Sequence, residues 1–144
     1  MNTSQIHVFI SHSWFYSGHY DNLSKWIFDR DWSVEQVSLD FRDNSVPINE
    51  PIHNADNDIQ LKNAIYDKIS SSHIIIVPIG MYGSYSKWIQ KEIEGANEHE
   101  KPILAVNPWE KEKKNSIAVQ NAIKVVGWDK DDIVAGIWEL FKNR

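Results

Sequence analysis

The chain alternates short runs of apolar residues with longer stretches in which apolar residues recur every three or four positions. The short runs predict buried β-strands, and the spaced stretches predict amphipathic helices that pack on them. The predicted strands lie within Ile6–Ile10, Val37–Phe41, Ser70–Gly80, Lys101–Trp109 and Ala122–Trp128. The predicted helices are Tyr20–Asp31, one that begins at about Asp58, Ser86–His99 with Ser86 as N-cap, a short one around Ser116–Ile123, and one capped by Asp129.

This βαβαβαβαβα order predicts an α/β fold with a flavodoxin-like, five-stranded parallel sheet of order 2-1-3-4-5 and helices on both faces. The second strand supports that order. Its apolar residues Val37, Leu39 and Phe41 alternate with Ser38 and Asp40, which predicts an edge strand with one buried face. A chain of 144 residues suits one domain, 1–144.

The segment Arg42–Asn57 breaks the pattern of short connections. It contains two prolines and many Asn and Asp residues, and it is longer than most connections in compact domains. We therefore interpret this segment as a candidate lid or mobile loop.

Charge and composition narrow the possible partners. The net charge is -5, and basic residues are scattered apart from Lys111–Lys114, so a nucleic-acid partner is not expected. The absence of cysteine excludes disulfides and thiolate metal sites, and it favours a reducing cytoplasm. No segment approaches the roughly 20 apolar residues of a membrane span, and the amino terminus does not resemble a secretion signal. We expect neither a membrane partner nor processing.

In open α/β sheets, ligands bind beyond the carboxyl ends of the strands, near the point where the strand order reverses. This rule nominates polar and aromatic residues that follow three of the predicted strands. They are Ser11, His12, Ser13 and Trp14, then Gly80, Met81 and Tyr82, and finally Asn107, Pro108 and Trp109.

The predicted helix Ser86–His99 starts at the same rim and carries Trp88 and Glu92 one turn apart. With Ile89 at 0° on a helical wheel, Glu92 lies at about -60° and Trp88 at about -100°. Glu92 is therefore expected to flank the buried stripe, half out of water, with a raised pKa. The alternative is structural, with a solvated acid whose stem covers apolar surface and a tryptophan used for packing.

Four segments together resemble a TIR domain, specifically the bacterial TIR-like group of Thoeris anti-phage defence systems. They are "VFISHSW", "SVP", "YSKWIQKEI" and "KPILAVNPW", and the resemblance spans nearly the whole chain. The family's NAD-cleaving motif is a serine-x-tryptophan followed four residues later by glutamate. Here it stands as Ser86, Trp88 and Glu92, while Ile89 occupies a position where many relatives have cysteine.

The resemblance implies cleavage of the bond between nicotinamide and ribose in NAD, a substrate rather than a cofactor, to give ADP-ribose or a cyclic isomer. Glu92 would be the catalytic carboxylate that stabilises the cationic sugar. Expected partners besides NAD are further copies of the chain and a separate effector that responds to the product. The expected substrate-binding residues are Ser11, His12, Trp14, Tyr82, Ser86, Trp88 and Trp109.

Other classes fit the sequence less well. His7, His53 and His73 lack the spacing of metal ligands, so no metal is assigned. Neither the G-x-S-x-G elbow of serine hydrolases nor the G-x-G-x-x-G fingerprint of dinucleotide folds is present. The remaining alternatives are a non-enzymatic TIR interaction module and a domain that senses a nucleotide without cleaving it.

Overall fold

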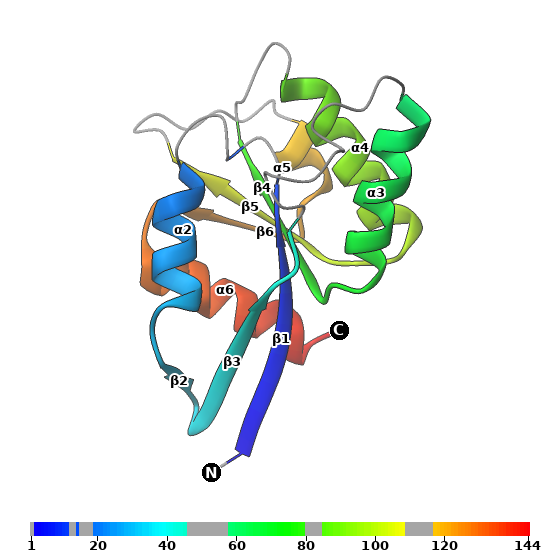
Figure 1. Cartoon of the computed structure of the whole chain (residues 1–144). Coiled ribbons are helices and arrows are strands. Elements are labelled where there is room, and N and C mark those ends of the chain that lie inside the picture. The colour runs from blue at the N-terminus through cyan, green and yellow to red at the C-terminus, as the bar shows by residue number, and fades with distance from the viewer. Residues whose placement is uncertain (1, 12–13, 15–18, 46–57, 80–84, 109–116) are drawn as a thin grey trace.

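The computed structural model describes residues 2–11, 14, 19–45, 58–79, 85–108 and 117–144. Within these ranges strands and helices alternate along most of the chain (Figure 1). The strands are β1 (Asn2–Ile10), β2 (Trp32–Val34), β3 (Val37–Asp43), β4 (Ile74–Pro78), β5 (Ile103–Asn107) and β6 (Lys124–Gly127). The helices are α2 (His19–Phe28), α3 (Asp58–Ser70), α4 (Tyr85–Glu98), α5 (Ile117–Asn121) and α6 (Lys130–Lys142).

The fold is mixed α/β, with one sheet of strand order β2-β3-β1-β4-β5-β6. Among the described residues the sheet has six strands and not five, so the predicted count was wrong and the order differs from the predicted one by the additional strand β2. The five predicted strands form the parallel part, β3-β1-β4-β5-β6, and β2 adds an antiparallel strand beside β3. For the same reason β3 is not an edge strand.

A tight turn produces the additional strand. Trp32, Ser33 and Val34 pair with Leu39, Ser38 and Val37, which leaves a two-residue turn of Glu35 and Gln36. Both turn residues have positive φ, 53° and 66°, as a type I′ hairpin requires. The usual sequence signal for such a turn is Asn-Gly or Asp-Gly. The dipeptide Glu-Gln is not such a signal, so the turn was not predicted. The Glu35 carboxylate accepts hydrogen bonds from Trp138 Nε1 and Lys142 Nζ, both at 3.0 Å, which lower its pKa and join the turn to α6.

The central strands are buried on both faces, and their alternate residues enter two separate cores. Ile6, Val8 and Ile10 of β1 point into the core beneath α2 and α6. Phe9 points the other way, into the core beneath α3, α4 and α5. Figure 1 shows α2 and α6 on one side of the sheet and α3 and α4 on the other. This arrangement confirms the predicted placement of helices on both faces.

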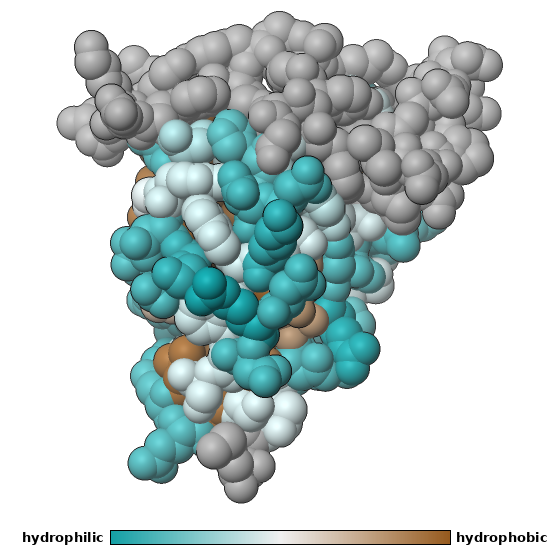
Figure 2. All heavy atoms as spheres, turned by 60° about the vertical axis from the view of Figure 1, so that its left-hand side comes forward, coloured by the Kyte–Doolittle hydropathy of each residue, from teal (hydrophilic) through white to brown (hydrophobic). Residues whose placement is uncertain are grey.

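Helix boundaries agree with the prediction from the sequence to within about three residues, and the largest difference is α2, which ends at Phe28 and not at Asp31. Asp129 caps α6, since its carboxylate accepts a hydrogen bond from the Asp132 amide at 3.0 Å. By contrast α4 begins at Tyr85, so Ser86 lies inside its first turn and is not the predicted N-cap. On the face over α2, hydrophilic side chains predominate among the described residues (Figure 2). Among the helices described, none is long and apolar enough to cross a membrane.

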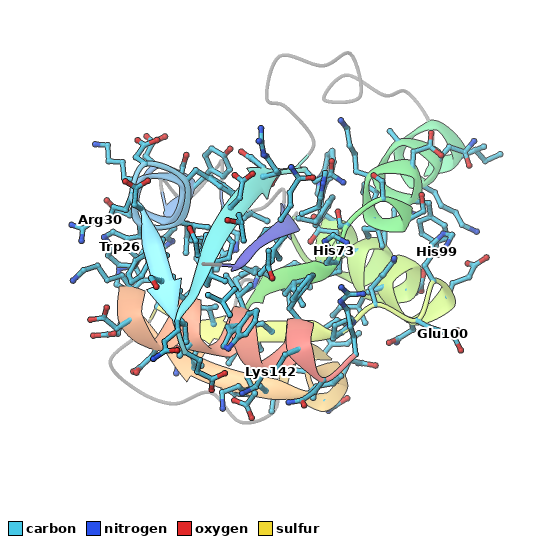
Figure 3. The ribbon with its side chains drawn as sticks, turned by 90° about the horizontal axis from the view of Figure 1, so that it is seen from below. Trp26, Arg30, His73, His99, Glu100 and Lys142 are labelled. Atoms are coloured by element: carbon cyan, nitrogen blue, oxygen red, sulfur yellow. The ribbon has the colours of Figure 1, made fainter. Side chains whose placement is uncertain are left out.

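His73 joins β1 to β4 at the amino end of β4, near the middle of the sheet (Figure 3). Its backbone N–H donates to the carbonyl of His7 at 2.8 Å, and its Nδ1 accepts the backbone N–H of His7 at 2.9 Å. The second bond requires an unprotonated Nδ1. Burial, followed by the positive charge of Arg144, lowers the pKa of His73 below its ordinary 6.5.

The sign of this shift predicts a loss of stability in acid. His73 binds a proton more readily in the unfolded chain, so its contribution is complete above pH 6.5 and is lost as pH falls through the lower folded pKa. We expect the midpoint temperature of thermal unfolding to decrease as the pH is lowered from 7 to 5. His73→Asn, whose amide oxygen can accept the same hydrogen bond without titrating, should flatten the curve. His19, whose pKa is also lowered by burial, stays in both proteins. If the midpoint temperatures of the wild type and the variant depended on pH in the same way, this role of His73 would be contradicted.

The left-handed turn predicts a stabilising substitution. Gln36→Gly relieves a positive φ that side chains resist, and after the entropy cost of glycine it should raise the free energy of unfolding by roughly 0.5–1 kcal/mol. Glu35→Gly relieves the same kind of strain but removes the acceptor for Trp138 and Lys142, so it should gain less or lose stability. Urea unfolding of both variants measures the difference, and an equal gain would argue against anchoring by Glu35.

Candidate functional site

The carboxyl ends of β1, β4 and β5 lie side by side and form one rim. Just beyond β1, the Ser11 amide donates to the Ile76 carbonyl of β4 at 2.8 Å. Just beyond β4, the Ile79 amide donates to the Val106 carbonyl of β5 at 3.0 Å. These two bonds join residues that follow β1 and β4 to the neighbouring strands, as expected for a parallel α/β sheet.

Glu92 lies in the second turn of α4, which follows β4 and therefore starts at this rim. It is 0% exposed, so the expectation of a half-solvated carboxylate was wrong. The neighbouring helix α3 explains the difference. A Cβ added to Gly95 would lie 2.8 Å from the ring of Tyr66, which shows that α3 packs closely on this flank of α4. Helical geometry places Glu92 between Ile89, in the core beneath the sheet, and Gly95.

Trp88 lies one turn before Glu92 on the same helix. It is half-buried and packs against the apolar core formed by α3, α4 and the sheet. The exposed part of the ring could contact a ligand at the rim, while the buried part fixes the first turns of α4. The described geometry thus supports packing, and stacking on a ligand remains a prediction.

Trp14 is completely buried, on the side of the sheet that carries α2 and α6. Its ring centroid lies 5.1 Å from His19 and 5.6 Å from Trp128, and Trp128 lies 4.8 Å from Trp26. This aromatic cluster packs α2 against the residue that follows β6. In this position Trp14 packs beneath the residues of the rim. Contact between Trp14 and the substrate remains a prediction.

Ser11, at the end of β1, is completely buried. Of the other predicted site residues, Ser86 lies in the first turn of α4, and its side chain is outside the described structure. Three more predicted site residues lie outside the described residues, namely His12, Tyr82 and Trp109. The same holds for residues 46–57 of the predicted lid. The structure therefore brings Ser11 and the start of α4 to one rim, and it leaves these other predictions open.

A polar group at the start of the long segment after β3 was not among the residues predicted from the sequence. The Ser45 hydroxyl accepts the Ile10 amide at 2.8 Å, and the Ser45 amide donates to Asp43 Oδ1 at 3.0 Å. Asp43 also accepts a hydrogen bond from the Tyr20 hydroxyl, and burial followed by this bond raises the pKa of Tyr20. The letters "DNS" indicate a turn, but nothing local in them indicates the contact with β1.

The described residues contain no group of three or more His, Asp or Glu side chains arranged to hold a metal ion. The polar groups described at the rim include carboxylate, hydroxyl and backbone amide groups and the side-chain amide of Asn107 at the end of β5, together with the aromatic ring of Trp88. Such a set can bind the hydroxyls and ring of a nucleotide and can stabilise a positive charge that develops on a sugar.

Solved structures resemble this fold at low sequence identity. A CMP N-glycosidase from Clostridium botulinum, BcmB, aligns with a TM-score of 0.52 and 13% identity over 92% of this chain and 98% of its own. A 3-dehydroquinate dehydratase-like protein from Bifidobacterium longum aligns with a TM-score of 0.46 and 10% identity over 99% of this chain and 98% of its own. At 13% identity the similarity to BcmB shows the fold alone.

Sequence comparison identifies the family. No curated protein sequence matches the chain. The family described as "Thoeris protein ThsB, TIR-like domain" matches residues 9–113, which include the end of β1, all of α4 and β5, and the Trp88–Glu92 pair. This match covers well over half of the chain and confirms the resemblance drawn from its motifs: the protein belongs to the family of TIR-like domains of the Thoeris protein ThsB.

Proposed function

We propose that the protein cleaves the bond between nicotinamide and ribose in NAD, with Glu92 as the catalytic carboxylate. The observation that carries this proposal is the complete burial of Glu92 in a helix that starts at the rim. Burying a carboxylate is costly, and ionisable groups buried beside a ligand-binding rim are frequent at functional sites. A functional role supplies the reason to keep it there.

The chemistry suits a buried acid. Nicotinamide leaves with the electron pair of its bond to ribose C1′, and the sugar passes through an oxocarbenium-like state. The negative charge of Glu92 would stabilise that state or orient the ribose hydroxyls, and its effect would be strong because water is excluded. Water then attacks C1′ to give ADP-ribose, or a nucleophile within the molecule attacks to give a cyclic isomer.

Two comparisons support a nucleotide-cleaving reaction. The family match spans Ser86, Trp88 and Glu92, the residues at which the resemblance to TIR domains places an NAD-cleaving motif. The similarly folded BcmB is an N-glycosidase for CMP, so a fold of this kind can accommodate cleavage of a bond between a base and a sugar. In a defence system the released product would act as a signal for a separate effector protein.

Glu92→Gln is the direct test of the proposed role. It preserves size and hydrogen-bonding capacity but removes the charge, so NAD cleavage should fall about 10²–10³-fold. Chromatography and mass spectrometry would follow NAD and its products in cells, with and without phage challenge, and with purified protein. Glu94→Gln is the matched control, because Glu94 is exposed on the same helix and bonds only to Gln90 among the contacts described for it.

The outcomes separate the functions under consideration. Loss of cleavage in Glu92→Gln but not in Glu94→Gln supports the enzyme and identifies its product. If both variants and the wild type leave NAD intact while defence persists, the catalytic proposal fails. Binding of NAD without turnover would then indicate a sensing domain, and no binding would indicate an interaction module.

The close packing of α3 on α4 predicts a second effect on activity. Gly95→Ala places a methyl group against Tyr66 and Ile69, which must move apart and open the flank that covers Glu92. We expect NAD cleavage to fall roughly tenfold although no site residue has changed. Gly136→Ala adds a methyl group to α6 on the opposite face of the sheet and should retain activity. Equal losses in the two variants would indicate general destabilisation.

A further inference from the structure

The carboxyl end of β1 extends beyond its neighbour β3. The β1–β3 ladder ends where Val8 faces Asp43, and the next bond on this side joins the Asn44 amide to the Val8 carbonyl at 2.8 Å. Ile10 lies two residues further along and directs its amide to the same side. Because Ile10 is completely buried, water cannot satisfy that amide.

Ser45 takes the place of the missing strand. Its hydroxyl oxygen accepts the Ile10 amide at 2.8 Å, and the residue is 6% exposed. The following residue, Ser11, directs its amide to the opposite side, where it bonds to Ile76 of β4. The end of β1 is therefore held from both sides, by a strand carbonyl on one side and by a single hydroxyl group on the other.

The hydroxyl group is itself held in place. Asp43 accepts the Ser45 amide through Oδ1 and the Tyr20 hydroxyl through Oδ2. Tyr20 lies in the first turn of α2, so the carboxylate connects the end of β3 to the helix that follows β1. A continuous series of hydrogen bonds thus runs from Tyr20 through Asp43 and Ser45 to the residue before Ser11.

We propose that Ser45 is a positioning residue for substrate binding, which holds the carboxyl end of β1 in a defined place at the rim where the nucleotide would bind. This inference rests on the proposed NAD cleavage. Ser45 acts through the backbone of Ile10, and Asp43 and Tyr20 act through Ser45. Glu92 lies on α4, which this series of bonds does not include, so Ser45 affects binding more than the chemical step.

The kinetic test is Ser45→Ala, which leaves the buried Ile10 amide without its acceptor. We expect KM for NAD to rise about five- to tenfold, the equivalent of about one neutral hydrogen bond, with kcat nearly unchanged. The Kd for NAD, measured by titration in the Glu92→Gln background, should rise by the same factor. Ser45→Thr retains the hydroxyl group and should restore both values.

The control is Leu140→Val, which shortens a buried side chain of α6 next to the residues that precede β5, away from the rim. Ser72 does not serve as a control, because its hydroxyl accepts a hydrogen bond from the side chain of Asn44, the neighbour of Ser45. A purely structural loss lowers the amount of folded protein and thus the maximal rate, while KM stays constant. If Ser45→Ala shows that pattern, or if Leu140→Val raises KM equally, the positioning role is wrong.

A second variant tests the same proposal in case Ser45→Ala does not fold. Tyr20→Phe keeps the half-buried ring but removes the bond to Asp43, and it should raise KM by a smaller factor with kcat retained. If both variants fold and keep the wild-type KM and Kd, this inference alone fails. If the wild type neither binds nor cleaves NAD, the proposed function fails and the positioning role fails with it.

Discussion

The structure depends on burial of both faces of β1, β4 and β5. All five residues of β4 are buried, so neither face of this strand can meet water. Only helices on both sides can cover such a strand, and a parallel sheet with crossover helices provides them. The same connectivity brings the carboxyl ends of the central strands to one rim, where α4 also begins. The position of the candidate site is therefore a consequence of how the apolar strands are covered.

Local patterns in the sequence were sufficient to predict most elements, because continuous apolar runs and helical spacing directly reflect burial. They were insufficient where one element depends on another distant in the chain. The Glu35–Gln36 turn contains no glycine or asparagine, and its contacts with Trp138 and Lys142 come from the last helix. Likewise, a helical wheel for α4 showed the face toward the sheet but not the close approach of α3 at Gly95.

Buried polar side chains mark the places where stability alone does not explain the sequence. Ser11, Ser45 and Glu92 are each less than a tenth exposed, in a protein whose core otherwise consists mainly of aliphatic residues. Ser45 accepts the Ile10 amide, and Glu92 carries a carboxylate whose burial costs free energy that an apolar residue would not cost. Conflicts of this kind between packing and chemistry are expected at functional sites.

The bond between Glu35 and Trp138 connects residues that are 103 positions apart in the chain. The β2 and β3 segments are synthesised early, but the left-handed turn between them gains this support only after α6 has been synthesised and has docked. Until then one edge of the sheet and the core beneath α6 stay incomplete. The nascent chain therefore exposes strand edges and apolar surface for most of its synthesis, a period in which chaperones would protect it from aggregation.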